Sequence, residues 1–189
     1  MLKYWQKNIK EISNQENIET NISNTYTIIM NWLHDNNFQG ACHNISAAMY
    51  ILLKEKNIDA ILCIGEINND NMNIRLDHSW IEINDKIYDV TIFMPLPSGV
   101  PFPPVFFSKN LDTNQITDFR YRGTKETDLD FAARTVYNFN LEQYAEYQQN
   151  ELEVIRLWNL TKNLGELIGI NLNIDMLKSK YGKTKRVLK

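Results

Sequence analysis

The sequence predicts an α+β protein in which a cysteine-bearing helix packs on a small antiparallel sheet. Apolar residues recur at helical spacing near both ends of the chain. Three short apolar runs lie between residues 59 and 93, each bounded by polar or turn-forming residues. Because the strands are clustered between helices and do not alternate with them, the order is typical of the α+β class.

The first 56 residues are expected to be mostly helical. Two apolar faces indicate helices within residues 1–37, one formed by Trp5, Ile9 and Ile12 and the other by Ile28, Trp32 and Leu33. The clearest helix spans residues 41–56, where one stripe contains Ile45, Ala48, Met49, Leu52 and Leu53. Asn57 suits the left-handed position that follows the last helical turn.

Strands are predicted at residues 59–67, 74–83 and 86–93. Asn84-Asp85 joins the last two, and these residue types suit a tight hairpin. The proline-rich stretch at 95–104 is expected to be a surface loop. Residues 105–121 are a candidate for further strand pairing.

The rest of the chain is predicted to be helical. A capping box of Asn140 and Gln143 indicates a long helix from Asn140 through Leu160. A short helix is predicted at 174–181. The basic tail from Lys178 to Lys189 is expected to be solvated and frayed.

The bulk composition restricts the functional classes. A chain of 189 residues suits one domain, with a core at 38–92, N-terminal helices at 1–37 and a C-terminal extension at 93–189. The net charge of −3 argues against a nucleic-acid partner. No uncharged apolar run reaches the ~18 residues of a membrane span, and two cysteines form no disulfide framework. We therefore expect a cytoplasmic protein.

Cys42 is the candidate nucleophile. It lies near the start of the helix predicted at 41–56, where first-turn amides and the helix dipole favour an anion. A thiol held as a thiolate is a strong nucleophile. Cys63, within a buried strand, is expected to be an apolar core residue. His43 is expected to point away from Cys42, because successive residues on a helix do not face each other.

The matching imidazole is expected from His78, in the second predicted strand. If the hairpin turn holds two residues, Ile83 pairs with Lys86, and Asp89 becomes a diagonal neighbour of His78 on the same face. Diagonal neighbours lie roughly 7–8 Å apart at the backbone, a gap that a carboxylate and an imidazole can bridge. A charged Asp89 in an otherwise apolar strand also needs a partner.

Four segments in this order resemble the transglutaminase-like superfamily. They are residues 40–46 with the cysteine at a helix start, residues 57–65 with the turn into a strand, His78-Ser79-Trp80 in place of His-Ala-Trp, and Tyr88-Asp89-Val90-Thr91 in place of Leu-Asp-Pro-Thr. The resemblance covers residues 38–92. Val90 stands where the family has proline, and His43 stands where an aromatic residue often follows the cysteine.

The resemblance implies a papain-like fold and acyl transfer through a thioester on a peptide or protein amide. By it, Cys42 is the nucleophile, His78 the general acid and base, and Asp89 the orienting group. Gln39 is a candidate oxyanion donor, and Trp80 either walls the site or fills the core. Water as second substrate gives a peptidase or deamidase, and an amine gives a transglutaminase.

Two other interpretations stay open. One is a binding or scaffolding protein that keeps this fold without turnover, and the other is a protein-targeting effector with the same chemistry. The cysteines and histidines lack zinc-ligand spacing, so no metal or other cofactor is expected. The expected partner is a peptide or protein substrate, with no nucleic acid and no membrane.

Overall fold

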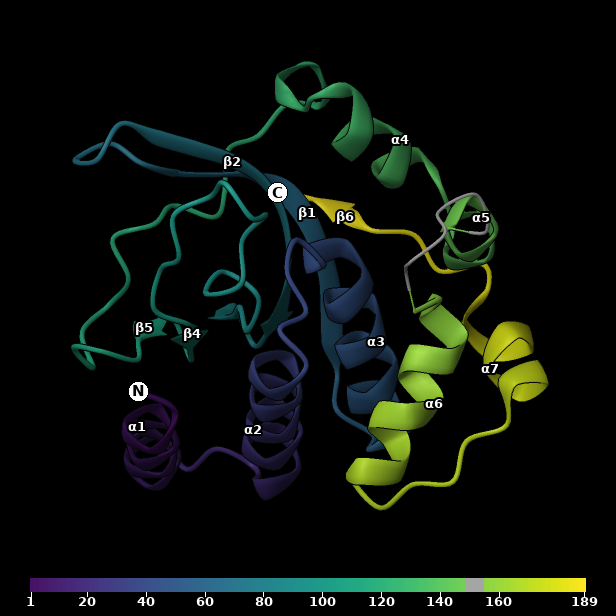
Figure 1. Cartoon of the computed structure of the whole chain (residues 1–189), viewed down its shortest axis with the longest axis horizontal. Coiled ribbons are helices and arrows are strands. Elements are labelled where there is room, and N and C mark those ends of the chain that lie inside the picture. The colour runs from purple at the N-terminus through teal and green to yellow at the C-terminus, as the bar shows by residue number, and fades with distance from the viewer. Residues whose placement is uncertain (149–154) are drawn as a thin grey trace.

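The computed structural model describes residues 1–148 and 155–189 (Figure 1). Its helices are α1 (Leu2–Glu16), α2 (Thr20–Asp35), α3 (Cys42–Glu55), α4 (Phe131–Asn138), α5 (Leu141–Tyr147), α6 (Leu157–Leu167) and α7 (Ile174–Tyr181), with a 3-10 turn η1 (Glu126–Asp128). Its strands are β1 (Ala60–Asn69), β2 (Ile74–Ile83), β3 (Lys86–Tyr88), β4 (Val105–Phe106), β5 (Lys109–Asn110) and β6 (Val187–Leu188). The α+β class is confirmed.

Helix α3 lies at the centre of the molecule. It packs on β1 and β2, while α2 and α6 flank it on either side, with α1 and α7 outside them (Figure 1). The predicted apolar stripe is buried in full, and so are Ala47 and Ile51 on other faces of the helix. An all-round apolar helix is expected where neighbours cover every side.

The hairpin of β2 and β3 has the predicted register. Ile83 pairs with Lys86, Glu82 with Ile87, and Ile81 with Tyr88. Asn84 and Asp85 have φ values of 49° and 60°, as a type I′ turn requires. The turn chemistry therefore fixes the register of the strand that leads to Asp89.

The third strand, expected to span residues 86–93, ends at Tyr88. Oδ1 of Asp89 accepts hydrogen bonds from the backbone N–H groups of Thr91 and Ile92, at 3.0 and 3.2 Å. Such side-chain bonds to the following backbone turn the chain and compete with a sheet ladder. The backbone of Asp89 pairs instead with Val105.

The sheet is mixed, not antiparallel as predicted. Its order is β3-β2-β1-β6, and β6 runs parallel to β1. The prediction of a frayed basic tail is therefore wrong, since Val187 and Leu188 pair with Cys63 and Ile64. A strand at the edge of a sheet offers backbone N–H and C=O groups to a further strand. Strand β6 pairs with this edge of β1 although the residues before β6 are basic.

The prediction of one long helix from Asn140 through Leu160 is also wrong. The capping box of Asn140 and Gln143 opens α5 as predicted, but α5 ends at Tyr147. Arg156 has extended backbone angles and precedes the separate helix α6. Residues 149–154, within the predicted helix, lie outside the described residues.

Three further predictions hold. Helix α7 has the predicted bounds, and Asn57 adopts the left-handed conformation with φ 61°. The stretch at 105–121 contributes the small β4–β5 hairpin. One buried apolar cluster runs through the helices and the adjoining sheet face, drawing residues from Trp5 to Tyr181.

Candidate functional site

Cys42 occupies the first residue of α3, and its side chain is half-buried. The preceding residue, Ala41, has no side chain that can cap the helix. Among the described residues no side chain accepts from the first-turn N–H groups, which point toward the region in front of the helix. This end of α3 favours negative charge on sulfur or on a bound group.

Gly40 brings the chain into this helix by a turn that requires glycine. Its φ is +64°, and a Cβ added there would lie 2.5 Å from Cδ2 of Leu96. The Gly40 N–H donates to the carbonyl of Met94 at 2.9 Å. The start of the proline-rich stretch therefore packs against the residues that lead into Cys42.

The structure brings His78 and Asp89 together, as the hairpin register predicts. The distance from Nε2 of His78 to Oδ2 of Asp89 is 2.9 Å, and both side chains are buried. The Thr91 hydroxyl also lies 3.2 Å from Nε2. Because Asp89 engages Nε2, the other ring nitrogen, Nδ1, is the one available to the Cys42 sulfur.

Asp89 is held as a carboxylate by four donors besides His78. Its Oδ2 accepts from the hydroxyl of Tyr121 at 2.9 Å, and its Oδ1 accepts from the Thr91 hydroxyl and from the backbone of Thr91 and Ile92. Burial alone would raise the pKa of Asp89, but His78 and these hydrogen bonds outweigh it and lower the pKa.

The ionisation states of Cys42 and His78 favour a thiolate–imidazolium pair, with Asp89 stabilising the imidazolium. Burial alone would raise the pKa of Cys42, but interactions with His43 and His78 outweigh it and hold that pKa well below its ordinary value. For His78, burial favours the neutral ring, yet Asp89 and Cys42 outweigh it and raise the pKa to about 10. Between those two pKa values the sulfur is anionic and His78 carries a proton.

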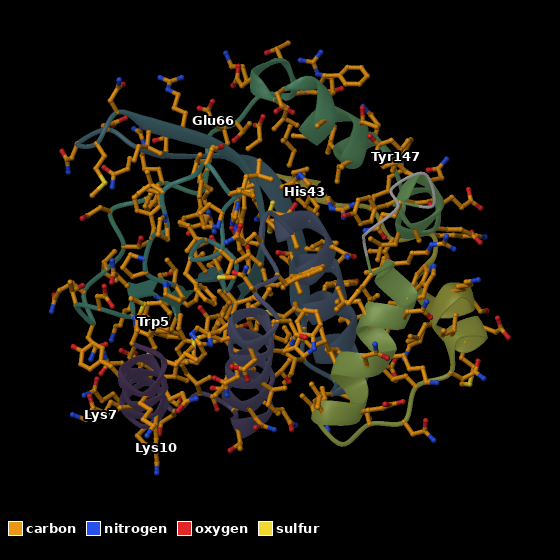
Figure 2. The ribbon with its side chains drawn as sticks, viewed as in Figure 1. Trp5, Lys7, Lys10, His43, Glu66 and Tyr147 are labelled. Atoms are coloured by element: carbon orange, nitrogen blue, oxygen red, sulfur yellow. The ribbon has the colours of Figure 1, made fainter. Side chains whose placement is uncertain are left out.

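His43 does not point away from Cys42, so that prediction is wrong. Its imidazole lies at the N-terminal end of α3 (Figure 2) and helps to lower the pKa of Cys42. Side chains on a helix lean toward its N-terminus. At the first two positions no earlier turn separates them, so neighbouring side chains can meet beyond the helix end.

Arg186, in the tail predicted to be solvated, also lies beside the N-terminal end of α3. Its side chain is 3% exposed, and Nη2 donates to the carbonyl of His43 at 3.1 Å. The guanidinium lies 4.5 Å from the ring centroid of Tyr144 and interacts electrostatically with Cys42. Within residues 1–148 and 155–189 it pairs with no carboxylate. No local pattern marks it, because β6 carries it to the site.

Replacing Arg186 with Met is expected to make Cys42 less acidic, because a buried cation near the thiolate is lost. The carbonyls of His43 and Val136 also lose this donor, at about 1–3 kcal/mol of folding stability. The pH dependence of Cys42 alkylation and urea unfolding measure the two effects. Exposed Lys185, replaced with Met, is the matched control. An unchanged alkylation midpoint in Arg186→Met would refute the electrostatic role.

The two other predicted site residues, Gln39 and Trp80, have their hydrogen bonds elsewhere and not with Cys42 in the described structure. The Gln39 amide is exposed and donates to Oδ1 of Asn37 at 3.2 Å, and no hydrogen bond joins it to Cys42 in the described structure. Trp80 is fully buried in a second apolar cluster with Cys63 and Tyr121, and its Nε1 donates to Glu82 at 3.4 Å. Its surroundings are those of a core residue.

A cavity of about 180 Å³ lies between α4, α5 and the residues on either side of Cys42, Ala41 and His43. Its lining comprises Gly40, Ala41, His43, Ala132, Val136, Tyr144, Tyr147 and Gln148. Helices α4 and α5 therefore form a wall of a cavity beside the N-terminal end of α3. The described ranges contain no group of three or more His, Cys, Asp or Glu side chains that could hold a metal ion.

The fold and the site define an α+β protein with a thiol at a helix N-terminus and a buried imidazole–carboxylate pair that interacts with it electrostatically. A scan against protein-family models, a search of the curated proteins and a search of the solved structures each find no match. In the described part of the chain, no helix has the length and apolar character needed to cross a membrane.

Proposed function

We propose that this protein is a cysteine-dependent acyl-transfer enzyme of the transglutaminase-like kind, acting on peptide or protein amides. The observation that carries this proposal is the buried His78–Asp89 pair, 2.9 Å apart, whose imidazole interacts with Cys42 at the start of α3. A structural histidine does not require a buried carboxylate on one side and a thiol on the other. Perturbed ionisation of this kind is concentrated at functional sites.

The arrangement of elements also suits the papain-like core that the sequence resemblance implies. The cysteine opens a buried helix, the histidine lies on a strand packed against that helix, and the aspartate follows the next strand. Acyl-transfer chemistry needs a nucleophile, a proton shuttle and an orienting group in this mutual contact. Here Cys42, His78 and Asp89 take those roles in turn.

The proposed reaction begins with attack of the Cys42 thiolate on the carbonyl carbon of an amide. A C–S bond forms, and the carbonyl electron pair moves to oxygen. The tetrahedral intermediate collapses when the C–N bond breaks and the leaving nitrogen takes the proton of His78. A second nucleophile then gives its proton to His78 and attacks the thioester, which releases the sulfur as thiolate. Water is the second nucleophile we favour, giving a peptidase or deamidase.

The first experiment is the pH dependence of Cys42 alkylation by iodoacetamide. Cys63 is replaced with Ala throughout, although burial already raises the pKa of its thiol to about 12. We expect rapid alkylation well below the ordinary thiol pKa of ~8.5, because the thiolate is already formed. In His78→Ala the midpoint should rise, since the imidazolium that stabilises the thiolate is lost.

His34→Ala is the matched control, because His34 is an exposed histidine paired with Asp35 on α2. It should alkylate like the parent. Slow alkylation of the parent that does not respond to His78→Ala would contradict the proposed enzyme. Such a result would favour a binding or scaffolding protein that keeps the fold.

A further inference from the structure

A second imidazole, that of His43, follows Cys42 directly on α3 and is not used by the proposed triad. Nδ1 of His43 lies 2.7 Å from the hydroxyl oxygen of Ser79 on β2. The backbone of Ser79 is fixed in turn by Ser46 of α3, whose hydroxyl donates to the Ser79 carbonyl at 2.8 Å. The ring of His43 is therefore held between the helix and the sheet, with one nitrogen engaged.

The Ser79 hydroxyl determines which nitrogen of His43 carries the proton. Ser79 is 0% exposed, so its hydroxyl hydrogen requires an acceptor in the protein. In the described part of the chain its one hydrogen-bond partner is Nδ1 of His43. The hydroxyl therefore donates to Nδ1, and the ring proton lies on Nε2. His43 presents an N–H donor, not a base, on the side of the ring away from Ser79.

The backbone of His43 is fixed as well. Arg186 donates to its carbonyl oxygen, and α3 continues directly from it. Half-buried His43 also lines the 180 Å³ cavity at the N-terminal end of α3. A donor whose ring and backbone are both held is preorganised, which is the property that makes transition-state stabilisation effective.

We propose that His43 is a catalytic residue that donates a hydrogen bond from Nε2 to the oxyanion of the tetrahedral intermediate, with Ser79 as the positioning residue that sets its tautomer. This inference rests on the proposed acyl-transfer function. In the resting protein the same donor stabilises the thiolate. When sulfur bonds to the carbonyl carbon, the negative charge moves to the carbonyl oxygen. The Nε2–H group of His43 then donates its hydrogen bond to that oxygen.

The proposal fills a role that the other candidates leave open. Gln39 donates to Asn37, and Trp80 donates to Glu82 within the core. The first-turn N–H groups of α3 supply part of an oxyanion site, and His43 adds a side-chain donor to them. The ligand class is any acyl donor with a planar carbonyl, such as an ester, a thioester or an amide.

Two reagents separate oxyanion stabilisation from thiol reactivity. With p-nitrophenyl acetate, the thiolate forms a C–S bond, the carbonyl oxygen becomes an oxyanion, and p-nitrophenolate leaves. With iodoacetamide, the thiolate displaces iodide at a saturated carbon, and no oxyanion forms. The ratio of the acylation rate constant to the alkylation rate constant at one pH cancels the thiolate fraction. It therefore reports changes that act on the carbonyl reaction and not on the thiolate fraction.

The ratio is measured for His43→Phe, His43→Gln and Ser79→Ala, all with Cys63→Ala. We expect His43→Phe to lower it by on the order of 100-fold, the effect of removing one oxyanion donor. His43→Gln keeps an N–H donor and should recover part of the loss. Ser79→Ala releases the tautomer and should give a smaller decrease than His43→Phe. His34→Phe, at an exposed histidine, should leave the ratio unchanged.

Circular dichroism of each variant establishes that it is folded, and Ser79→Ala provides a test if His43→Phe does not fold. An unchanged ratio in the folded His43 variants would overturn the proposal, as would equal losses of acylation and alkylation. Failure of the proposed function is a different result. The parent would then form no acyl-enzyme faster than Cys42→Ala does, and the role of His43 would fail with it.

Discussion

Replacing Asp89 with Asn is expected to lower the rate of acyl transfer by on the order of 10⁴-fold, the cost of the same change in another histidine-orienting triad. The carboxylate accepts a hydrogen bond from Nε2 of His78 and raises the pKa of that imidazole. An amide presents its NH₂ group or a neutral oxygen there instead. His78 then loses both its protonated form at neutral pH and its fixed orientation.

The same substitution should also destabilise the fold. Asp89 is 1% exposed, and removing one partner of a buried ion pair costs about 3–5 kcal/mol. Because the folded-state pKa of Asp89 is lowered, its contribution is present above the unfolded pKa of ~3.9 and is lost as the pH falls through the folded value. The acid limb of the stability curve should therefore flatten in Asp89→Asn.

On the alkaline side, the stability that His78 contributes is lost as the pH rises. The pKa of His78 is raised to about 10, so its contribution is complete below the unfolded value of ~6.5 and is lost as the pH rises toward 10. Without Asp89, most of that contribution disappears. Urea unfolding from pH 3 to 10 measures both limbs.

Asp85→Asn is the matched control for these measurements, because exposed Asp85 lies in the hairpin turn and Asn also suits its positive φ. Its stability and its alkylation profile should stay close to those of the parent. If Asp89→Asn destabilised the fold but left the pH dependence of Cys42 alkylation unchanged, Asp89 would be a structural residue only.

Trp80→Ala is expected to cost about 3–5 kcal/mol of folding stability, the usual range for removing a buried tryptophan. Trp80 is 0% exposed and packs edge-to-face against Tyr121, with ring centroids 5.1 Å apart. Since domains are stable by only about 5–15 kcal/mol, this is a large fraction of the total. Tyr121 donates to Asp89, so the cavity should also loosen the carboxylate.

Trp80→Phe distinguishes a core role from a direct role of the indole N–H in the site. Phenylalanine keeps most of the apolar volume and removes the indole N–H, so acylation by p-nitrophenyl acetate should stay near the parent rate. A large loss of acylation in folded Trp80→Phe, with alkylation preserved, would assign the indole to the oxyanion. Half-buried Trp32, replaced with Ala, is the comparison for stability, and its loss should be smaller.

The candidate site could be predicted in part because some of its geometry is local. The apolar stripe of α3 places Cys42 at a helix start, and Asn84-Asp85 sets the β2–β3 register. Both depend on spacing and turn chemistry within a few residues. His78 and Asp89 follow from that register, even though β3 ends one residue before Asp89.

The structure alone reveals the other groups around the sulfur. Arg186 bonds to the carbonyl of His43, 143 positions away in the sequence, only because β6 pairs with the edge of β1. His43 lies near Cys42 because successive side chains at the first positions of a helix are not separated by an earlier turn. Ser79, on β2, fixes the tautomer of His43.

The sequence by itself thus determined the α+β class, the helix that carries Cys42 and the hairpin register that brings His78 to Asp89. Only the tertiary structure decided the parallel edge strand, the break between α5 and α6, and the positions of Arg186 and His43. The physical reason is range. Periodicity and turn propensity act between residues close in sequence, whereas a sheet edge selects its partner, and a buried cation its surroundings, by packing the whole chain.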